Sequence, residues 1–132
     1  PKAGLREKLA AHIGTFALPW TATDDPAAAG ASGEVLWNNE LQQGVMVFRG
    51  LAPNDPSEAQ YQLWIFDATR SEAHPVDGGV FDVAASSGEV EIPIRARLPV
   101  AEPTLFAITV ERPGGVVVSS RERLPLLAKV GG

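Results

Sequence analysis

Residues 60–67 read Gln-Tyr-Gln-Leu-Trp-Ile-Phe-Asp and contain the densest apolar run of the chain, Leu63-Trp64-Ile65-Phe66. Successive side chains of a β-strand point to opposite faces of its sheet, so a run that is apolar on both faces predicts a strand covered on both sides. We therefore expect the strand Gln60–Asp67 in the middle of the fold. Outward from it, apolar residues recur at every second position, which is typical of strands.

Eight or nine short strands are expected, separated by turns rich in Gly and Pro. Besides Gln60–Asp67 they are 15–22, Glu34–Asn38, Gly44–Arg49, Val80–Val83, Glu89–Leu98, Thr104–Glu111, Val116–Val118 and Leu126–Val130. Loops are expected at Asp24–Gly33 and His74–Gly79, and a tight turn at Ser86-Ser87-Gly88. Strands and helices do not alternate, which argues against a parallel doubly wound sheet. The predicted fold class is all-β: an antiparallel β-sandwich of Ig-like or Greek-key type.

Two of the expected strands contain a proline, Pro19 in 15–22 and Pro93 in Glu89–Leu98. Proline donates no backbone hydrogen bond to a neighbouring strand, so both strands are predicted at sheet edges. The alternation places these side chains on the inner faces: Phe16, Leu18, Trp20, Val90, Ile92, Ile94 and Leu98.

A short helix is predicted over residues 2–13, because Leu5, Leu9 and Ile13 recur at four-residue spacing and Gly14 follows. With 132 residues the chain fits one domain. We expect residues 1–14 to form a helical lead and residues 15–132 a single β-sandwich domain.

The charge and composition exclude several classes of function. A net charge of −5 argues against nucleic acid as a partner. The basic residues near both ends are either solvated or close to anionic lipid. The chain has no cysteine, which excludes disulfides, thiolate catalysis and cysteine-bound metal. No apolar run approaches the ~20 residues that span a bilayer and no signal peptide is visible, so any membrane segment is expected upstream of Pro1.

Catalytic and metal-binding motifs are missing from the sequence. The two histidines, His12 and His74, stand in no H-x-H or H-E-x-x-H pattern, and no serine lies in G-x-S-x-G. Asp24, Asp25 and Asp77 lack the spacing of a calcium loop, and the Gly78-Gly79 and Gly114-Gly115 pairs do not open helices. We predict no catalytic, cofactor-binding or metal-binding residue, and therefore no enzyme and no cofactor.

Two other functions stay open on the residues alone. A binding module for sugar or peptide would expose a tryptophan in a groove, although Trp20, Trp37 and Trp64 all fall on apolar stripes and are expected to be buried. Trp37, Trp64 and Phe106 are the predicted core. A small hydrolase would need His74 or His12 beside a carboxylate or serine in a pocket; Glu89 and Glu91 share one strand face that looks solvated.

Several motifs resemble the C-terminal domain of the anti-sigma-K factor family. Tyr61-Gln62-Leu63-Trp64 is similar to the family's Y-Q-L-W strand. Four further segments resemble it in order and spacing: Gly33–Trp37 (G-x-V-x-W), Gly44–Leu51 before a displaced Pro53 (a strand and G-L-P turn), Gly78–Phe81 (G-x-F) and Phe106–Gly115 (an A-V-T-x-E-x-x-G-G hairpin). The likeness covers residues 33–130. Ser119–Pro125 departs from the family's P-T-G step, so this loop is expected to differ in shape or contacts.

The resemblance implies a role for this chain as one part of a larger protein. Such proteins have a cytoplasmic domain that binds a sigma factor, a transmembrane helix and an outer domain. Release of the sigma factor follows regulated proteolysis that begins on the outer side. This chain is then expected to be the extracytoplasmic regulatory domain, with residues 1–14 next to the membrane, a periplasmic protease as a possible partner, and no direct contact with the sigma factor.

Overall fold

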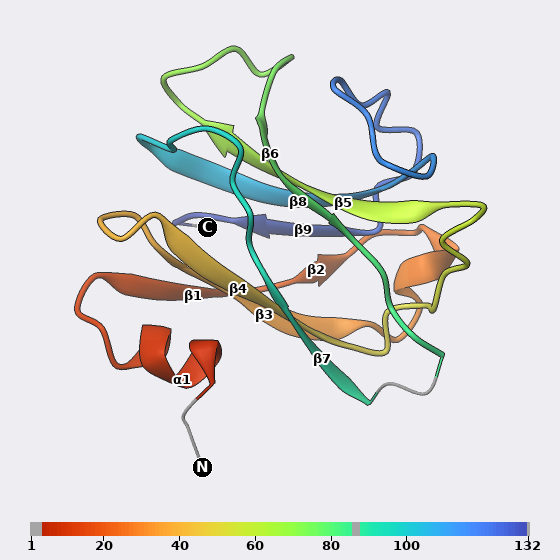
Figure 1. The fold of residues 1–132 in the computed structure, drawn as a ribbon, viewed down its shortest axis with the longest axis horizontal. Helices are drawn as coiled ribbons and strands as arrows, with labels where there is room; N and C mark the ends of the chain where they lie inside the picture. The colour runs from red at the N-terminus through yellow and green to blue at the C-terminus, as the bar shows by residue number, and fades with distance from the viewer. Residues whose placement is uncertain (1–3, 86–87, 132) are drawn as a thin grey trace.

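The computed structural model describes residues 4–85 and 88–131. In this part of the chain two antiparallel sheets pack face to face, with a single α-helix, α1 (Leu5–Ala10), on the outside (Figure 1). The predicted all-β antiparallel sandwich with a short N-terminal helix is confirmed. The remaining elements are β1 (Thr15–Pro19), β2 (Thr21–Ala22), a 3-10 turn η1 (Pro26–Ala28), β3 (Ser32–Asn38), β4 (Gln43–Arg49), β5 (Gln60–Asp67), β6 (Val76–Phe81), β7 (Glu89–Pro93), β8 (Pro103–Glu111) and β9 (Leu126–Lys129).

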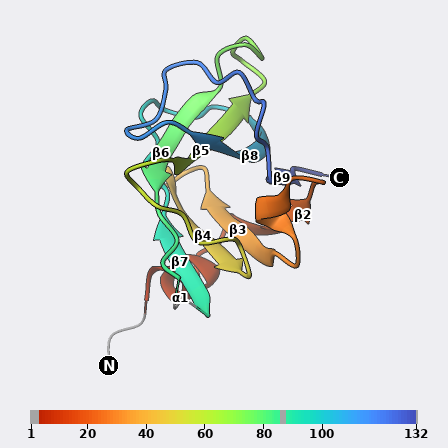
Figure 2. The same cartoon turned by 90° about the vertical axis from the view of Figure 1, so that its right-hand side faces the viewer.

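The first sheet, sheet A, has the strand order β1-β3-β4-β7, and the second, sheet B, has the order β2-β9-β8-β5-β6. The chain crosses between the sheets after β1, β2, β4, β6 and β7, as in Greek-key sandwiches. Strand β5 pairs with β8 on one side and β6 on the other, so the segment Gln60–Asp67 is an interior strand as predicted. Figure 2 shows the two layers, with α1 beyond sheet A and long loops beyond sheet B.

At both edges of sheet A the chain leaves the sheet and continues to sheet B, which links the two sheets at their sides. The predicted strand 15–22 divides at Trp20, whose buried indole donates to the carbonyl of Val47 at 3.2 Å, and β2 then joins sheet B. The predicted strand Glu89–Leu98 leaves sheet A at Pro93, and the backbone N–H of Arg95 donates to Gly78 O of β6 at 2.8 Å. Both strands are therefore shorter than predicted, while the predicted edge positions of β1 and β7 are confirmed.

The core between the sheets is aromatic. Trp37 and Phe106 are fully buried there, with ring centroids 6.1 Å apart. The stacked ring pairs Trp20–Phe48, Phe48–Phe81 and Phe81–Tyr61 form a continuous row, with centroids 5.4, 5.2 and 5.5 Å apart. Aromatic pairs of this kind contribute about 0.5–1.5 kcal/mol each beyond their burial.

Trp64 is also buried, with 2% exposure, but it lies on the other face of β5. Its neighbours Leu63 and Ile65 belong to the cluster between the sheets, whereas Trp64 does not, because side chains alternate along the strand. The burial predicted for Trp64 is correct, and its position is on the outer face of sheet B.

Close packing between strands explains one of the glycines in the sequence motifs. Gly33 of β3 has φ +136°, and a Cβ atom there would lie 2.0 Å from the carbonyl oxygen of Val47 on β4. Only glycine permits this backbone conformation and this approach. The first residue of the G-x-V-x-W segment is therefore a requirement of the β3–β4 pairing.

Three sequence-based boundaries are wrong. The helix ends at Ala10, so Ile13 lies beyond it and is 96% exposed instead of continuing the apolar stripe. Strand β6 begins at Val76 and includes Gly78. A side chain at Gly78 would collide with Leu63, so this glycine indicates close packing and not a loop. Leu98, predicted to face inward, is 51% exposed because the chain has left the sheet.

A fourth prediction also fails: Val116–Val118 forms no strand. The glycine turn at Gly114-Gly115 carries this segment across the outer face of sheet B, where the side chain of Gln62 binds the backbone of Val116. Val117 is 91% exposed. The predicted turn at Ser86-Ser87 lies outside the described residues.

Candidate functional site

The outer face of sheet B is covered by two loops, residues 68–75 and 112–125, which Figure 1 shows beyond β5 and β8. The 112–125 loop is fixed by glutamine side chains of β5. Gln62 donates to Val116 O at 3.0 Å and accepts from Val116 N at 2.9 Å, and Gln60 accepts from Gly114 N at 2.8 Å. Gln62 is buried and its two polar side-chain atoms both bind Val116, so its side chain fixes the backbone of this loop.

Each residue of Tyr61-Gln62-Leu63-Trp64 has a separate structural role. The Tyr61 hydroxyl donates to Ala52 O at 2.6 Å, which ties β5 to the segment after β4. Leu63 packs between the sheets. The Trp64 indole donates to the Thr109 hydroxyl of β8 at 2.8 Å beneath the loops. The motif therefore builds both faces of the central strand.

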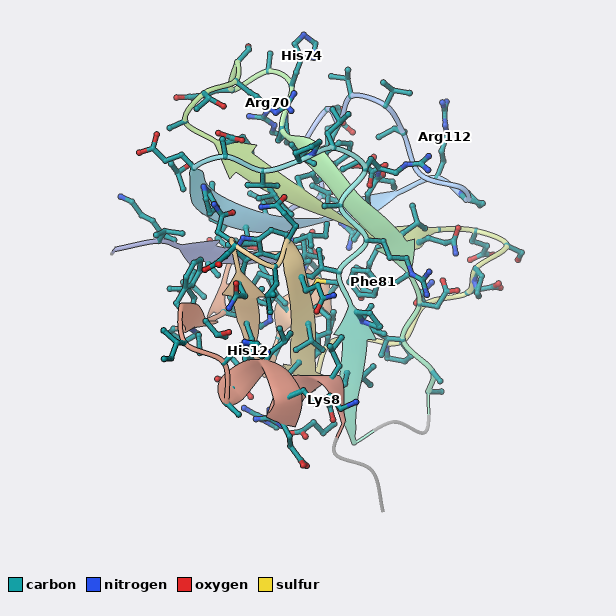
Figure 3. All side chains as sticks on the ribbon, turned by 60° about the vertical axis from the view of Figure 1, so that its left-hand side comes forward. Lys8, His12, Arg70, His74, Phe81 and Arg112 are labelled. Carbon is teal, nitrogen blue, oxygen red and sulfur yellow. The ribbon has the colours of Figure 1, made fainter. Side chains whose placement is uncertain are left out.

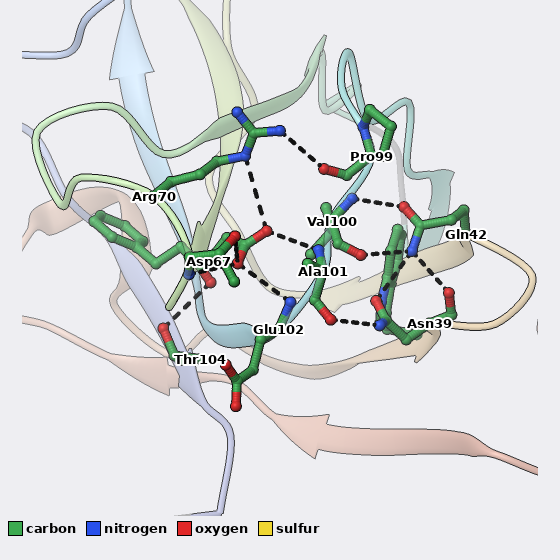
Figure 4. Close-up of polar contacts among 12 residues, drawn as sticks. Asn39, Gln42, Asp67, Arg70, Pro99, Val100, Ala101, Glu102 and Thr104 are labelled. Atoms are coloured by element: carbon green, nitrogen blue, oxygen red, sulfur yellow. Dashed lines mark hydrogen bonds and ion pairs between the residues drawn. The ribbon is translucent and has the colours of Figure 1, made fainter.

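Asp67, at the end of β5, joins the 68–75 loop to the segment before β8 (Figure 4). Its carboxylate accepts from the backbone and hydroxyl of Thr69 and from the backbone N–H groups of Ala101 and Glu102, at 2.7–3.2 Å. Burial alone raises the pKa of this carboxyl group, but the hydrogen bonds to its charged form outweigh burial and lower the pKa to about 2. Asp67 is therefore ionised at neutral pH and fixes two loops.

A second group of hydrogen bonds connects the two sheets at the same end of the molecule (Figure 4). The side chain of Gln42 donates to Val100 O at 2.8 Å and accepts from Val100 N at 2.7 Å. Asn39, in the same β3–β4 turn, donates to Ala101 O at 2.9 Å. The segment 99–102 is thus held from both sides, by the turn of sheet A and by Asp67 of sheet B.

Between the two loops lies an open groove of about 700 Å³. Its floor is the outer face of sheet B and its walls are the 68–75 and 112–125 loops. Apolar side chains cover the floor and one wall: Phe66, Leu105, Ala107, Leu127 and Leu124. Charged side chains stand at its rim: Arg70, Glu72, Arg121 and Lys129. We call these residues the sheet B groove.

Both arginines at the rim are held by contacts with neighbouring residues. Arg121 has a positive φ of +61°, its guanidinium carbon lies 4.8 Å from the centroid of the Phe66 ring, and it donates to the backbone carbonyl of Glu72. Arg70 donates to Pro99 O at 3.2 Å, with its Nε atom 3.8 Å from Asp67. The 112–125 loop therefore places the positive charge of Arg121 over the Phe66 ring.

The structure separates the residues that sequence reasoning considered for catalysis. His12 and His74 lie at opposite ends of the molecule and both are exposed (Figure 3). Asp25 caps η1 through the N–H of Ala27 and pairs with Arg123, and the Arg123 hydrogen bond lowers the pKa of Asp25. In the described residues no three His, Asp or Glu side chains cluster as metal ligands would.

The groups considered for sugar binding and glycoside hydrolysis serve structural roles. Trp20, Trp37 and Trp64 are at most 7% exposed, so none offers a face for stacking on a sugar. Glu89 is bound by Arg6 at 3.0 Å and Arg49 at 2.6 Å. These positions give no support to either chemistry.

Sequence reasoning missed the sheet B groove and Asp67. One signal was present: Asp67 and Thr69 follow a strand in the spacing of an Asx turn. The apolar outer positions of β8 and β9, such as Leu105 and Leu127, also indicate a covered face. The bonds from Asp67 to Ala101 and Glu102 span more than 30 residues, and no local pattern reveals them.

The fold is a β-sandwich domain whose loops are fixed by side-chain hydrogen bonds, and it contains no disulfides. Residues 8–120 match the family model described as Anti-sigma-K factor rskA, C-terminal. The chain therefore belongs to this family, and it is an anti-sigma factor domain of a regulatory kind. The match begins within α1 and ends inside the 112–125 loop, close to the departure at Ser119–Pro125. No curated protein and no solved structure matched the chain.

One further finding concerns membranes. In the described residues no helix has the length and apolar character needed to cross a bilayer.

Proposed function

We propose that this chain is the extracytoplasmic regulatory domain of a membrane-anchored anti-sigma factor. In the full protein a separate cytoplasmic domain would bind the sigma factor, and the domain described here would control release of that factor through regulated proteolysis on the outer side. The observation that carries the proposal is the family match over residues 8–120. The domain then acts through its folded or cleaved state and not through turnover of a substrate.

The packing of α1 supports a role for the N-terminal lead in this control. Leu9 is 1% exposed and packs against Leu36, Val45 and Val47 on the outer face of sheet A. Proteases cleave extended, accessible backbone, so residues within α1 are protected while the helix is docked. The four residues that follow, 11–14, are exposed and join the helix to β1. Cleavage there would separate the sandwich from everything N-terminal to it.

The exposed loops of the domain differ in how well they are protected from proteolysis. The Asp24–Gly33 loop contains η1, with Ala27 and Ala28 buried, and is tied to the 112–125 loop by the pair of Asp25 and Arg123 at 2.8 Å. It is therefore better protected than residues 11–14. Limited proteolysis with mass spectrometry should find first cuts at 11–14 or 119–124, and none within β5 or β8 before the domain unfolds.

The regulatory role is tested in cells with the full-length protein and a reporter that depends on its sigma factor. Deletion of residues 15–132 should change reporter activity, because the domain that controls cleavage is lost. Val117→Ala, at an exposed position, is the matched control and should leave the reporter unchanged. A reporter that is the same with and without residues 15–132, under every condition tried, would remove the support for a regulatory role.

The outer location has its own test. A protease added to intact cells from which the outer barrier has been stripped should degrade an epitope placed after residue 132. An epitope in the sigma-binding domain should survive the same treatment. Protection of both epitopes would place this domain inside the cell and contradict the proposal.

A further inference from the structure

We propose that the sheet B groove binds a single-chain amphiphile with an anionic head group, of which a medium-chain carboxylate is the simplest example. The acyl chain would lie on the floor formed by Leu105, Ala107 and Leu127, and the head group would meet Arg121 and Lys129 at the rim. Such binding is a property of this domain alone and does not depend on a sigma factor.

The size and lining of the groove suit such a ligand. Its volume of about 700 Å³ lies within the range of about 300–1,000 Å³ that is typical of small-molecule sites. The floor is apolar because the outer positions of β8 and β9 carry Leu105, Ala107 and Leu127. Burying an acyl chain there would remove apolar surface of both partners from water.

The charge at the rim favours an anion. Among the residues that line the groove, Arg70, Arg121 and Lys129 are cationic. The carboxylates of Asp67 and Glu72 also line it, and Asp67 lies 3.8 Å from Arg70, so three positive charges against two negative ones leave the lining with a net charge of +1. A positive rim on a chain of net charge −5 is a local arrangement and does not follow from the composition.

The backbone under the groove distinguishes an acyl chain from an extended peptide. A peptide that adds to a sheet needs free backbone groups. Here β8 and β9 pair with each other through Leu105–Lys129 and Ala107–Leu127, and Thr104 O accepts from Val130 N at 3.0 Å. Between β8 and β9 the floor therefore offers side chains and no open edge for a peptide strand, which suits a ligand without a peptide backbone.

The positions of the two loops are well defined around this space. Gln62 and Gln60 hold the 112–125 loop, and Asp67 holds the 68–75 loop. Arg121 lies in the left-handed region, which strains a non-glycine residue and persists only when surrounding contacts fix it. The groove is thus preformed, and a ligand would not have to order its walls.

The test is an NMR titration of the ¹⁵N-labelled 132-residue chain with dodecanoate, at concentrations below those at which the ligand self-associates. We expect saturable shifts confined to the 68–75 and 119–125 loops, β8 and β9. Shortening the ligand should weaken binding by up to about fourfold per methylene, because each buried CH₂ contributes up to about 0.8 kcal/mol. Dodecanol tests the apolar part alone, and butyrate tests the head group alone.

Two variants test the charges at the rim. Lys129→Gln and Arg121→Gln should each weaken dodecanoate binding roughly 1.5- to 5-fold, since exposed charge contacts are modest, and Lys129→Gln should leave dodecanol binding unchanged. Lys8→Gln on α1, on the opposite side of the molecule, removes the same charge and should leave both affinities unchanged. The spectrum of each variant reports directly whether it is folded.

Three results would overturn the proposal. Shifts that do not saturate, or that spread over the whole surface, would show that there is no site. Equal affinity for dodecanol and dodecanoate would remove the role of the cationic rim. Tighter binding of an acidic extended peptide to the same residues would assign the groove to a peptide.

Discussion

The two sheets are covered on their outer faces in different ways. On sheet A the cover is α1, held by the apolar contacts of Leu5 and Leu9 and by Arg6, which binds Glu34 at 2.7 Å and Glu89 at 3.0 Å at the surface. On sheet B the cover is two loops without regular structure, held by buried polar side chains of β5 such as Gln62 and Asp67.

The cover of sheet A can therefore detach more easily than the cover of sheet B. A six-residue helix is too short to be stable alone, so α1 is folded only while it is docked. The loops of sheet B are fixed by bonds whose loss would leave buried polar groups without partners, which costs about 1–3 kcal/mol for each group. We infer that sheet A can be exposed by a local event, whereas exposing the outer face of sheet B requires broader unfolding.

The largest expected effect comes from Trp64, beneath the cover of sheet B. Trp64→Ala should lower the free energy of unfolding by about 3–5 kcal/mol, because a large buried ring is lost and the Thr109 hydroxyl loses its partner. This is a large share of the ~5–15 kcal/mol that stabilises a typical domain. Chemical denaturation measures it, and Val117→Ala in the covering loop is the control, expected within about 0.5 kcal/mol of wild type.

A small effect of Trp64→Ala would mean that the loops of sheet B are as detachable as α1. If this variant does not fold, Trp64→Phe retains a ring and removes the hydrogen bond to Thr109. It should unfold more readily than wild type while keeping the same fold.

Leu9 gives the corresponding test on sheet A. Leu9→Ala should cost about 2–3 kcal/mol, at the lower end for a buried leucine, because the short helix can detach without unfolding the sandwich. Hydrogen exchange of the backbone amides should speed up in α1 and in the parts of β3 and β4 beneath it, and stay unchanged in β5 and β8. Lys8→Ala, at the exposed neighbouring position, is the control. Faster exchange throughout the protein would show that α1 is part of the cooperative core.

The comparison also shows which parts of the molecule the sequence could predict. The continuous apolar run identified β5 with its correct ends, because Leu63 and Trp64 face two separate apolar environments. It failed at Val116–Val118, whose apolar residues follow a glycine turn away from the sheet. It also failed at Gly78, because the collision with Leu63 that requires glycine becomes visible only in three dimensions.

The candidate site was less predictable for the same reason. Phe66, Arg121 and Lys129 come from three distant segments, and their meeting depends on loops held by Gln62 and Asp67. A hydrogen bond from a side chain to the backbone of a distant loop leaves no repeating pattern in the sequence. Local patterns therefore predict the strands but not the groove between the loops.

Asp67 provides a smaller effect with a defined pH dependence. Its pKa is lowered to about 2 in the folded state from an ordinary value of 3.8. A carboxyl group with a lowered folded pKa contributes stability above its unfolded pKa, and that contribution is lost as the pH falls from about 4 to about 2. Asp67→Asn should therefore cost about 1–2 kcal/mol at pH 7, and the difference from wild type should shrink over that pH range.

Denaturation curves between pH 7 and pH 2 measure this difference. Asp24→Asn, at an exposed carboxylate whose side chain makes no hydrogen bond within the described residues, is the control and should follow wild type at every pH. A difference between Asp67→Asn and wild type that stayed constant down to pH 2 would show that the charge of Asp67 does not hold the loops.

Arg6 should give the smallest effect and the one that depends most on salt. Arg6→Gln removes ion pairs with Glu34 and Glu89 that are about one-third exposed, so water and ions already weaken them. At low ionic strength α1 should exchange its amide hydrogens faster than in wild type, and at about 1 M salt, where screening acts over roughly 3 Å, the two proteins should become alike. Arg95→Gln, which removes an exposed charge beyond the other end of β7, should show no such salt dependence in α1.

The loops of sheet B should be unaffected by salt in wild type, Arg6→Gln and Arg95→Gln, because the bonds of Asp67 and Gln62 are shielded from solvent. If salt loosened those loops as much as it loosens α1, the two covers would not differ in kind, and sheet A would have no special role in exposing the lead to a protease.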